Sequence, residues 1–150
     1  MIKDYKGAIK DRDYILTYKL DHIDEMENFI QEAKIKTKYE MYDIKLKEVD
    51  YIEKFLSGMY YCKAVITNSY HGVLFSIIFN KPFVVFTNTD RGKERFNTLK
   101  EVYGIKDRFF DKNDKPSIDL LLTPLNLNYT TINYYRGISI EYLKKNLNVQ

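Results

Sequence analysis

Residues 64–86 read AVITNSYHGVLFSIIFNKPFVVF, and this stretch decides the fold that we expect. Residues 64–67 form a short apolar run rich in β-branched side chains, which is typical of a buried strand. Residues 73–79 are apolar almost throughout and stop just before Pro82, which indicates a buried helix. Residues 82–86 form a second apolar run, and proline is tolerated at the first position of a strand. Strand, helix and strand in this order make a βαβ unit and therefore predict a parallel sheet.

The turn at residues 68–72, between the first strand and the helix, is the candidate functional site. Such a turn lies at the carboxyl edge of an open α/β sheet, where ligands bind. The first amides of a helix lack intrahelical partners and carry partial positive charge, so they favour phosphate or carboxylate. Ser69 is a candidate N-cap, His71 can donate a hydrogen bond or a proton, and Gly72 would let a ligand approach the backbone. A plain capped helix whose histidine bonds to nearby backbone fits the same residues, so the turn alone leaves both interpretations open.

A polar segment at residues 87–92 follows the second strand of this unit. Because it also leaves the carboxyl end of a parallel strand, we expect it to face the same crevice as His71. Arg91, Lys93 and Arg95 cluster in and just after this segment. Cations beside a helix amino end would make a stronger anion site than either feature alone. A solvated basic loop is the alternative interpretation.

The remaining sequence alternates strand and helix patterns, so we expect one Rossmann-like α/β domain over residues 1–150, with a parallel sheet flanked by helices. Before the central stretch, the patterns predict strands at 14–18 and 38–44, a helix capped by Asp21 with apolar positions from 23 to 33, and a helix with apolar positions from 49 to 60. After it, they predict a helix over 96–103 closed by Gly104, followed by an extended piece at 105–110 and a surface loop at 111–117. A short helix at 118–122 and irregular chain at 125–131 come next. The last predicted element is a helix over 132–147, with Gly137 as a candidate interruption.

Composition excludes several classes of protein. The chain has 150 residues and a net charge of +3, which suits one domain with a core and is too small a charge to indicate nucleic acid as a partner. Cys62 is the only cysteine, so no disulfide forms within the chain; we expect a cytoplasmic location and a packed rather than nucleophilic thiol. No apolar run is long enough to cross a bilayer, and the amino terminus lacks the apolar core of a secretion signal.

Motifs for metals and nucleotides are missing. His22 and His71 are the only histidines, and neither lies in a ligand-like cluster, so we expect no metal site. Nothing in the sequence suggests a role for His22. The glycine-rich loops that bind mononucleotides and dinucleotides are also missing.

The segment TNSYHGVLFSIIFNKPFVVF, followed by RGKERFNTLKEVYGIKDR, resembles the carboxyl-terminal half of the polysaccharide pyruvyl transferases. The family pattern is an apolar strand, Thr-Asp-Ser-Phe-His-Gly, an apolar helix and a Lys-Pro-Phe strand. Arg-x-x-Arg-Phe-x-x-Leu-Leu and Gly-x-x-x-Arg elements come after it. Asn68 replaces the usual Asp, Tyr70 replaces Phe, and Lys100 stands where the second Leu would be. The matching positions are Thr67, Ser69, His71, Gly72, Phe75, Ser76, Lys81, Pro82, Phe83, Arg95, Phe96, Leu99, Gly104 and Arg108.

The resemblance implies a reaction. Members transfer the enolpyruvyl group of phosphoenolpyruvate onto two hydroxyls of a sugar, forming a pyruvate ketal and releasing phosphate; no cofactor is implied. It makes His71 the catalytic residue that contacts the donor, as general acid or as electrostatic partner of the phosphate. The expected substrate-binding residues around it are Ser69, Tyr70, Gly72, Arg91 and Arg95.

The resemblance also implies a larger architecture. Such enzymes have a two-domain GT-B-like fold, of which this chain would be the carboxyl-terminal domain, without the amino-terminal domain that supplies the acceptor side. We therefore expect the isolated chain to bind phosphoenolpyruvate weakly and to turn over nothing. An exposed apolar face with Tyr134, Tyr135 and Tyr142 as candidates would mark where the other half docks.

Partners and setting follow from the same resemblance. The expected partners are phosphoenolpyruvate, a saccharide or lipid-linked saccharide acceptor, and the amino-terminal domain, with no nucleic acid. The expected setting is surface polysaccharide biosynthesis in the cytoplasm, at the inner face of the membrane. Two alternatives stay open: the nucleotide-sugar half of a GT-B glycosyltransferase or sugar epimerase, and a degenerate, non-catalytic binding domain.

Overall fold

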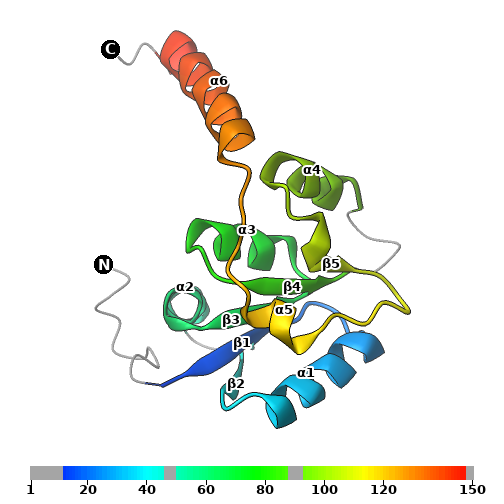
Figure 1. Cartoon of the computed structure of the whole chain (residues 1–150). Coiled ribbons are helices and arrows are strands. Elements are labelled where there is room, and N and C mark those ends of the chain that lie inside the picture. The colour runs from blue at the N-terminus through cyan, green and yellow to red at the C-terminus, as the bar shows by residue number, and fades with distance from the viewer. Residues whose placement is uncertain (1–11, 46–49, 88–92, 148–150) are drawn as a thin grey trace.

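A five-stranded parallel sheet forms the centre of the molecule (Figure 1). The computed structural model describes residues 12–45, 50–87 and 93–147. The strands lie in the order β2-β1-β3-β4-β5, and the predicted Rossmann-like α/β architecture is confirmed. Their bounds are β1 Tyr14–Tyr18, β2 Glu40–Asp43, β3 Ala64–Thr67, β4 Phe83–Phe86 and β5 Phe109–Phe110.

Six α-helices are described around this sheet, and most match the sequence patterns. Their bounds are α1 Asp24–Lys36, α2 Tyr51–Tyr61, α3 Tyr70–Ile78, α4 Lys93–Tyr103, α5 Ile118–Leu122 and α6 Tyr129–Leu147, with a short 3-10 turn, η2, at Lys106–Arg108. Gly104 follows α4 with a φ of 69°, the left-handed conformation predicted for a helix end.

Several boundaries differ from the sequence prediction; α3 and α4, for example, begin at Tyr70 and Lys93 rather than at residues 73 and 96. Helix α1 begins at Asp24 with Ile23 as its N-cap, because Asp21 belongs to a loop whose backbone is bonded to the turn after β3. The extended piece at 105–110 is η2 followed by the two-residue strand β5. Helix α6 starts at Tyr129, within the stretch expected to be irregular, and runs without a break through Gly137.

Alternating side chains along the strands sort into two separate cores. On β1, Tyr14, Leu16 and Tyr18 pack with residues of α2, α3 and α4 on one face of the sheet. Ile15 points to the other face, where it packs with residues of α1 and α5. The central strands β1, β3 and β4 are therefore buried on both faces, as parallel strands between two helical layers must be, whereas the edge strands β2 and β5 are partly exposed. Figure 1 shows α2, α3 and α4 on one side of the sheet, with α1 and α5 on the other.

The strand order reverses between β1 and β3, and this reversal places the candidate site. In open α/β sheets, ligands bind outside the carboxyl ends of the two strands at which the order reverses. Here those ends lead into the loop at residues 19–23, before α1, and into the turn at residues 68–69, before α3. The turn singled out from the sequence therefore lies at the topological switch point.

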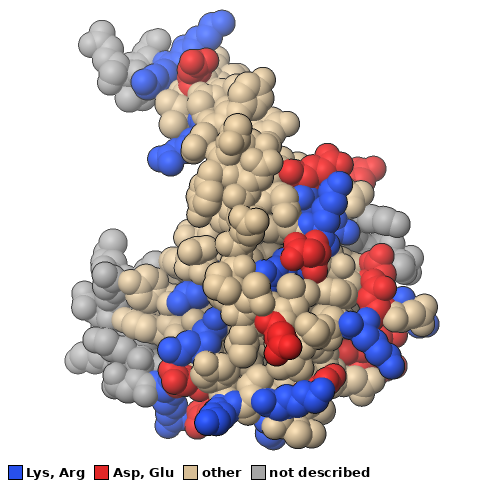
Figure 2. Space-filling model, viewed as in Figure 1, with Lys and Arg blue, Asp and Glu red and all other residues tan. Residues whose placement is uncertain are grey.

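Helix α6 extends away from the sheet body, and none of its described side chains is buried (Figure 1). Its surface is largely uncharged until the last turns (Figure 2). Tyr134, Tyr135 and Tyr142 are 65%, 50% and 66% exposed. The expected exposed apolar residues are therefore present, while what covers them in a larger assembly stays a prediction.

Candidate functional site

Ser69 caps helix α3, as its sequence position predicts. Its Oγ accepts a hydrogen bond from the Gly72 amide at 3.5 Å, and its own amide donates to Thr67 Oγ1 at 3.0 Å. The side chain is fully buried. Because the hydroxyl already serves the helix amino end, its contribution here is to shape the turn, and direct contact with a ligand stays a prediction.

Gly72 is required by the packing of α3 against β3. A Cβ at this position would lie 2.4 Å from the Oγ1 of Thr67, a distance that real side chains do not reach. The missing side chain therefore lets the first turn of α3 pack against the end of β3, and the residue is buried. Close approach of a ligand to this backbone stays a prediction.

His71 is exposed at the first turn of α3, and Arg95 lies near it across a shared aromatic ring. The imidazole packs edge-on to Tyr70, with ring centroids 6.0 Å apart. The Arg95 guanidinium lies 5.3 Å from the centroid of the same ring, a cation–π contact. The Phe96 ring also packs against Tyr70, with ring centroids 6.0 Å apart. Two of the predicted site residues, His71 and Arg95, thus both contact a third, Tyr70.

His71 makes no hydrogen bond or ion pair with any described residue. The alternative in which this histidine bonds to nearby backbone is therefore not what the described part of the chain shows. Its ring nitrogens are left available to a ligand. Arg91 lies outside the described residues, so of the predicted basic cluster only the side chain of Arg95 is placed by the structure.

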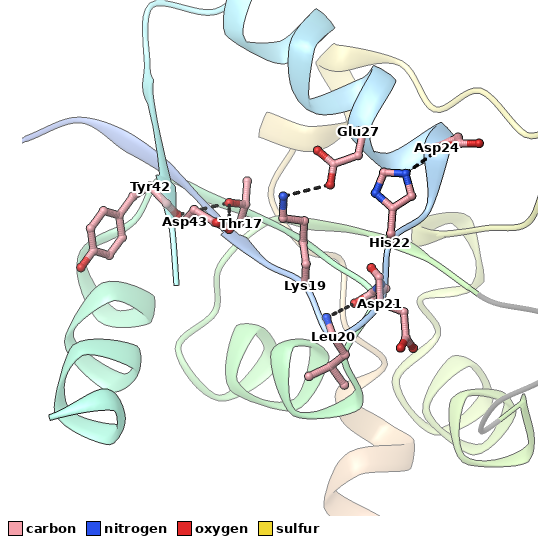
Figure 3. Close-up of polar contacts among 10 residues, drawn as sticks. Thr17, Lys19, Leu20, Asp21, His22, Asp24, Glu27, Tyr42 and Asp43 are labelled. Carbon is pink, nitrogen blue, oxygen red and sulfur yellow. Dashed lines mark hydrogen bonds and ion pairs between the residues drawn. The ribbon is translucent and has the colours of Figure 1, made fainter. Parts of the chain in front are cut away.

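Asn68 links the two loops of the switch point through hydrogen bonds. The sequence did not reveal this role of Asn68. Its Oδ1 accepts from the Leu20 amide and its Nδ2 donates to the Asp21 carbonyl, each at 2.8 Å. Thr67 Oγ1 donates to the Tyr18 carbonyl at 2.7 Å and adds a third link. The loop after β1, drawn in Figure 3, is therefore fixed to the turn that carries His71.

His22 is the residue that sequence reasoning missed. It lies on the loop after β1, where its Nε2 contacts Asp24 Oδ1 at 2.8 Å (Figure 3). Together with Thr87 and Phe110, it lines a cavity of about 230 Å³ at the ends of β4 and β5. Its position depends on the path of the loop across the sheet edge, and the only signal in the sequence is a histidine soon after a strand.

Cys62 is a packed core residue, as the sequence predicts. The Cys62 Sγ donates to the Met59 carbonyl at 3.3 Å, and burial raises the pKa of the thiol to about 12. The thiol is therefore neutral at neutral pH, and the predicted packing role is confirmed. Within residues 12–45, 50–87 and 93–147, no group of three histidine, cysteine or acidic side chains is arranged to hold a metal ion.

Comparison with known families identifies the chain. A sequence model of the family described as Polysaccharide pyruvyl transferase matches residues 2–91. The chain belongs to the polysaccharide pyruvyl transferase family. The match includes β3, the turn with His71, α3 and β4, and ends before Arg95 and Arg108. Comparisons with curated proteins and with solved structures give no significant match.

Arg108 has a structural role in this pyruvyl transferase chain. The side chain is almost fully buried, and its guanidinium donates to the Leu120 carbonyl at 2.7 Å and to the Pro124 carbonyl at 3.0 Å. Burial lowers its pKa, which the neighbouring Asp107 carboxylate partly opposes, and the group stays charged at neutral pH. Arg108 therefore anchors α5 and the chain after it rather than facing the carboxyl-edge crevice.

None of the described helices of this transferase combines the length and apolar character needed to span a bilayer.

Proposed function

We propose that this chain forms the phosphoenolpyruvate-binding part of a polysaccharide pyruvyl transferase. The observation that carries the proposal is an exposed His71 at the amino end of α3, with the Arg95 guanidinium on the same Tyr70 ring. Phosphoenolpyruvate carries a phosphate and a carboxylate. A helix amino end, a guanidinium and an imidazole are three groups that favour such an anion. Family membership supplies the reaction class.

The proposed chemistry forms two carbon–oxygen bonds and breaks one. A sugar hydroxyl adds to C2 of the enol while C3 gains a proton and becomes the methyl group. A second hydroxyl of the same sugar then displaces phosphate from C2, which closes the ketal; its proton leaves with the phosphate. In this scheme His71 either delivers the proton to C3 or stabilises charge on the departing phosphate. No cofactor takes part.

The wider setting is part of the same proposal. The complete enzyme has a GT-B-like fold with this chain as its carboxyl-terminal domain, and α6 docks against the amino-terminal domain through residues such as Tyr134, Tyr135 and Tyr142. The acceptor is a saccharide or a lipid-linked saccharide used for surface polysaccharide. The isolated chain therefore binds the donor weakly and does not catalyse transfer.

Calorimetry with phosphoenolpyruvate tests the donor site. We expect His71→Ala to weaken binding by about 10-fold or more, because a hydrogen bond to a charged ligand contributes roughly 1.5–3 kcal/mol. His22→Ala removes the chain's other histidine and serves as the matched control, with affinity expected within about twofold of wild type. Equal heats from His71→Ala and wild type would remove His71 from the donor site.

A further inference from the structure

Three adjoining cavities lie along α1, on the opposite face of the sheet from α3, and we refer to them together as the α1 groove. The first, of about 230 Å³, lies at the carboxyl edge beside His22; the second, of about 270 Å³, shares Glu25 with the first; the third shares Glu32 with the second. The far wall is formed in turn by residues 110–112, 113–116 and 117–119. Figure 1 shows this segment and α5 on the same side of the sheet as α1.

The groove is long and shallow rather than a closed pocket. Helix α1 has 13 residues, which corresponds to a length of ~20 Å at 1.5 Å per residue. The first two cavities are smaller than the roughly 300–1,000 Å³ typical of sites for compact drug-sized ligands, and the third, of about 510 Å³, lies within that range. Such a shape suits a linear chain of small units that lies along the helix.

The chemistry of the lining favours a hydroxyl-rich ligand over an anion. Six carboxylates and three lysines line the described groove, together with two asparagines and two hydroxyl side chains. Carboxylate and amide groups accept and donate the paired hydrogen bonds that neighbouring hydroxyls need. Phe110 and Pro116 supply apolar surface for the C–H faces of a sugar ring. The excess of negative charge disfavours phosphoenolpyruvate, so the groove is chemically distinct from the turn at His71.

The open end of the groove is fixed to the candidate donor site. His22 and Asp24 form a hydrogen-bonded pair on its rim. The residues just before His22 are bonded to Asn68, three positions before His71. A chain lying along α1 would therefore reach the same carboxyl edge of the sheet as the His71 turn, beside the ends of β4 and β5.

We propose that this groove binds a neutral saccharide chain as the acceptor of pyruvyl transfer. The inference rests on the proposed function, because the family description indicates a polysaccharide as substrate and the lining of the groove suits such a ligand. It revises the expectation that the amino-terminal domain alone provides the acceptor side. A lysine-rich peptide is the competing occupant of an acidic groove, and the experiment below separates the two.

Histidine-selective NMR tests the groove, because the chain contains only His22 and His71. The full chain is labelled with ¹⁵N-histidine, and His22→Asn and His71→Asn variants assign the two imidazoles. Phosphoenolpyruvate, cellohexaose, maltohexaose, β-1,4-galactohexaose and hexalysine are titrated separately. We expect at least one hexasaccharide to shift the signals of His22 and not those of His71, and phosphoenolpyruvate to do the reverse.

Two charge-removing variants on α1 provide the matched comparison. Glu25 lines the first two cavities, so Glu25→Ala should weaken hexasaccharide binding about 10-fold. Glu27 lies on the same helix but pairs with Lys19, so Glu27→Ala should stay within about twofold of wild type. Equal weakening by both variants would contradict a site in the groove.

The remaining outcomes separate the two proposals. If phosphoenolpyruvate shifts His71 while no hexasaccharide shifts His22, the acceptor groove is overturned and the donor site stands. If a hexasaccharide shifts His22 while phosphoenolpyruvate shifts neither histidine, the groove stands and the donor site is overturned. A larger response of His22 to hexalysine than to every hexasaccharide would assign the groove to a basic peptide and overturn the saccharide proposal.

Discussion

At position 68, asparagine stands where the family pattern has aspartate, and the structure gives the amide a use that a carboxylate lacks. One hydrogen bond needs an acceptor facing the Leu20 amide, and the other needs a donor facing the Asp21 carbonyl. An ionised aspartate accepts only, so it could keep the first bond and would set a negative charge against the carbonyl in the second. Asparagine at position 68 therefore suits the path of the loop after β1 better than the aspartate of the family pattern would.

We predict that Asn68→Asp lowers the free energy of unfolding by about 1–3 kcal/mol at pH 7, because one partly buried carbonyl loses its donor. Urea unfolding followed by circular dichroism measures the change. Asn97→Asp, at an exposed position on α4, is the matched control and should shift stability by less than about 0.5 kcal/mol. A loss no greater than that of the control would show that the Asn68 bonds do not hold the two loops together.

Single residues could be predicted where local rules govern them. The cap at Ser69 follows from its place before an apolar helix, and the exposed His71 follows from its place in the first turn. The role of Asn68 could not be predicted, because its partners lie on a loop that meets it only when the strand order is known, and the place of His22 beside Thr87 and Phe110 depends on the same packing of distant segments. The packing of Gly72 against Thr67 could not be predicted, since this neighbour becomes visible only in the packed structure.

At the scale of elements, one buried arginine organises the chain after β5. Arg108 lies on η2 and donates to the carbonyls of Leu120 and Pro124, which are 12 and 16 residues away. These bonds fix the short helix α5, and with it the segment that forms the far end of the groove. A helix of five residues has little stability of its own, so it depends on such an anchor.

We predict that Arg108→Gln lowers the free energy of unfolding by about 2–4 kcal/mol, because glutamine has a shorter side chain and would leave at least one of the two carbonyls without its charged donor. Arg136→Gln, on the exposed face of α6, is the matched control and should change stability little. Chemical denaturation of the two variants tests this. Similar stability of both would mean that the buried guanidinium is not an anchor.

Elements with strong local patterns were predictable, and those set by distant contacts were not. The β3–α3–β4 unit follows from apolar runs that need burial on both faces of a sheet. Strand β5 lies within the piece predicted as extended at 105–110, but its two-residue length and its pairing with β4 are set by distant contacts that no local pattern reveals. The groove joins α1 to residues 110–119, far apart in sequence, and no motif marks it.

At the scale of the molecule, the sheet body and α6 differ in how they are held. The body has two apolar cores, whereas α6 buries no described side chain and exposes several large apolar ones. The Asn128 amide donates to the Tyr103 carbonyl just before α6 begins, so the chain is fixed to α4 at that point. Stability of the body should therefore be nearly independent of the helix.

We predict that truncation after Asn128 lowers the free energy of unfolding by less than about 1 kcal/mol, because little apolar area returns to water. The same truncation should reduce self-association at high concentration, since exposed apolar surface is removed. Thermal unfolding and sedimentation velocity measure the two effects. A loss of more than about 3 kcal/mol would mean that α6 is an integral part of the fold.

The burial of the chain's single cysteine has a practical consequence. Because Cys62 is buried in the core with its thiol protonated, maleimide dyes should not react with it in the native state. A cysteine introduced on the outer surface of α6 would then be the sole labelling point, with no need to remove the natural one. Fluorescence energy transfer between such a label and a dye on an oligosaccharide would then measure the distance from α6 to a saccharide bound beside α1 in single molecules.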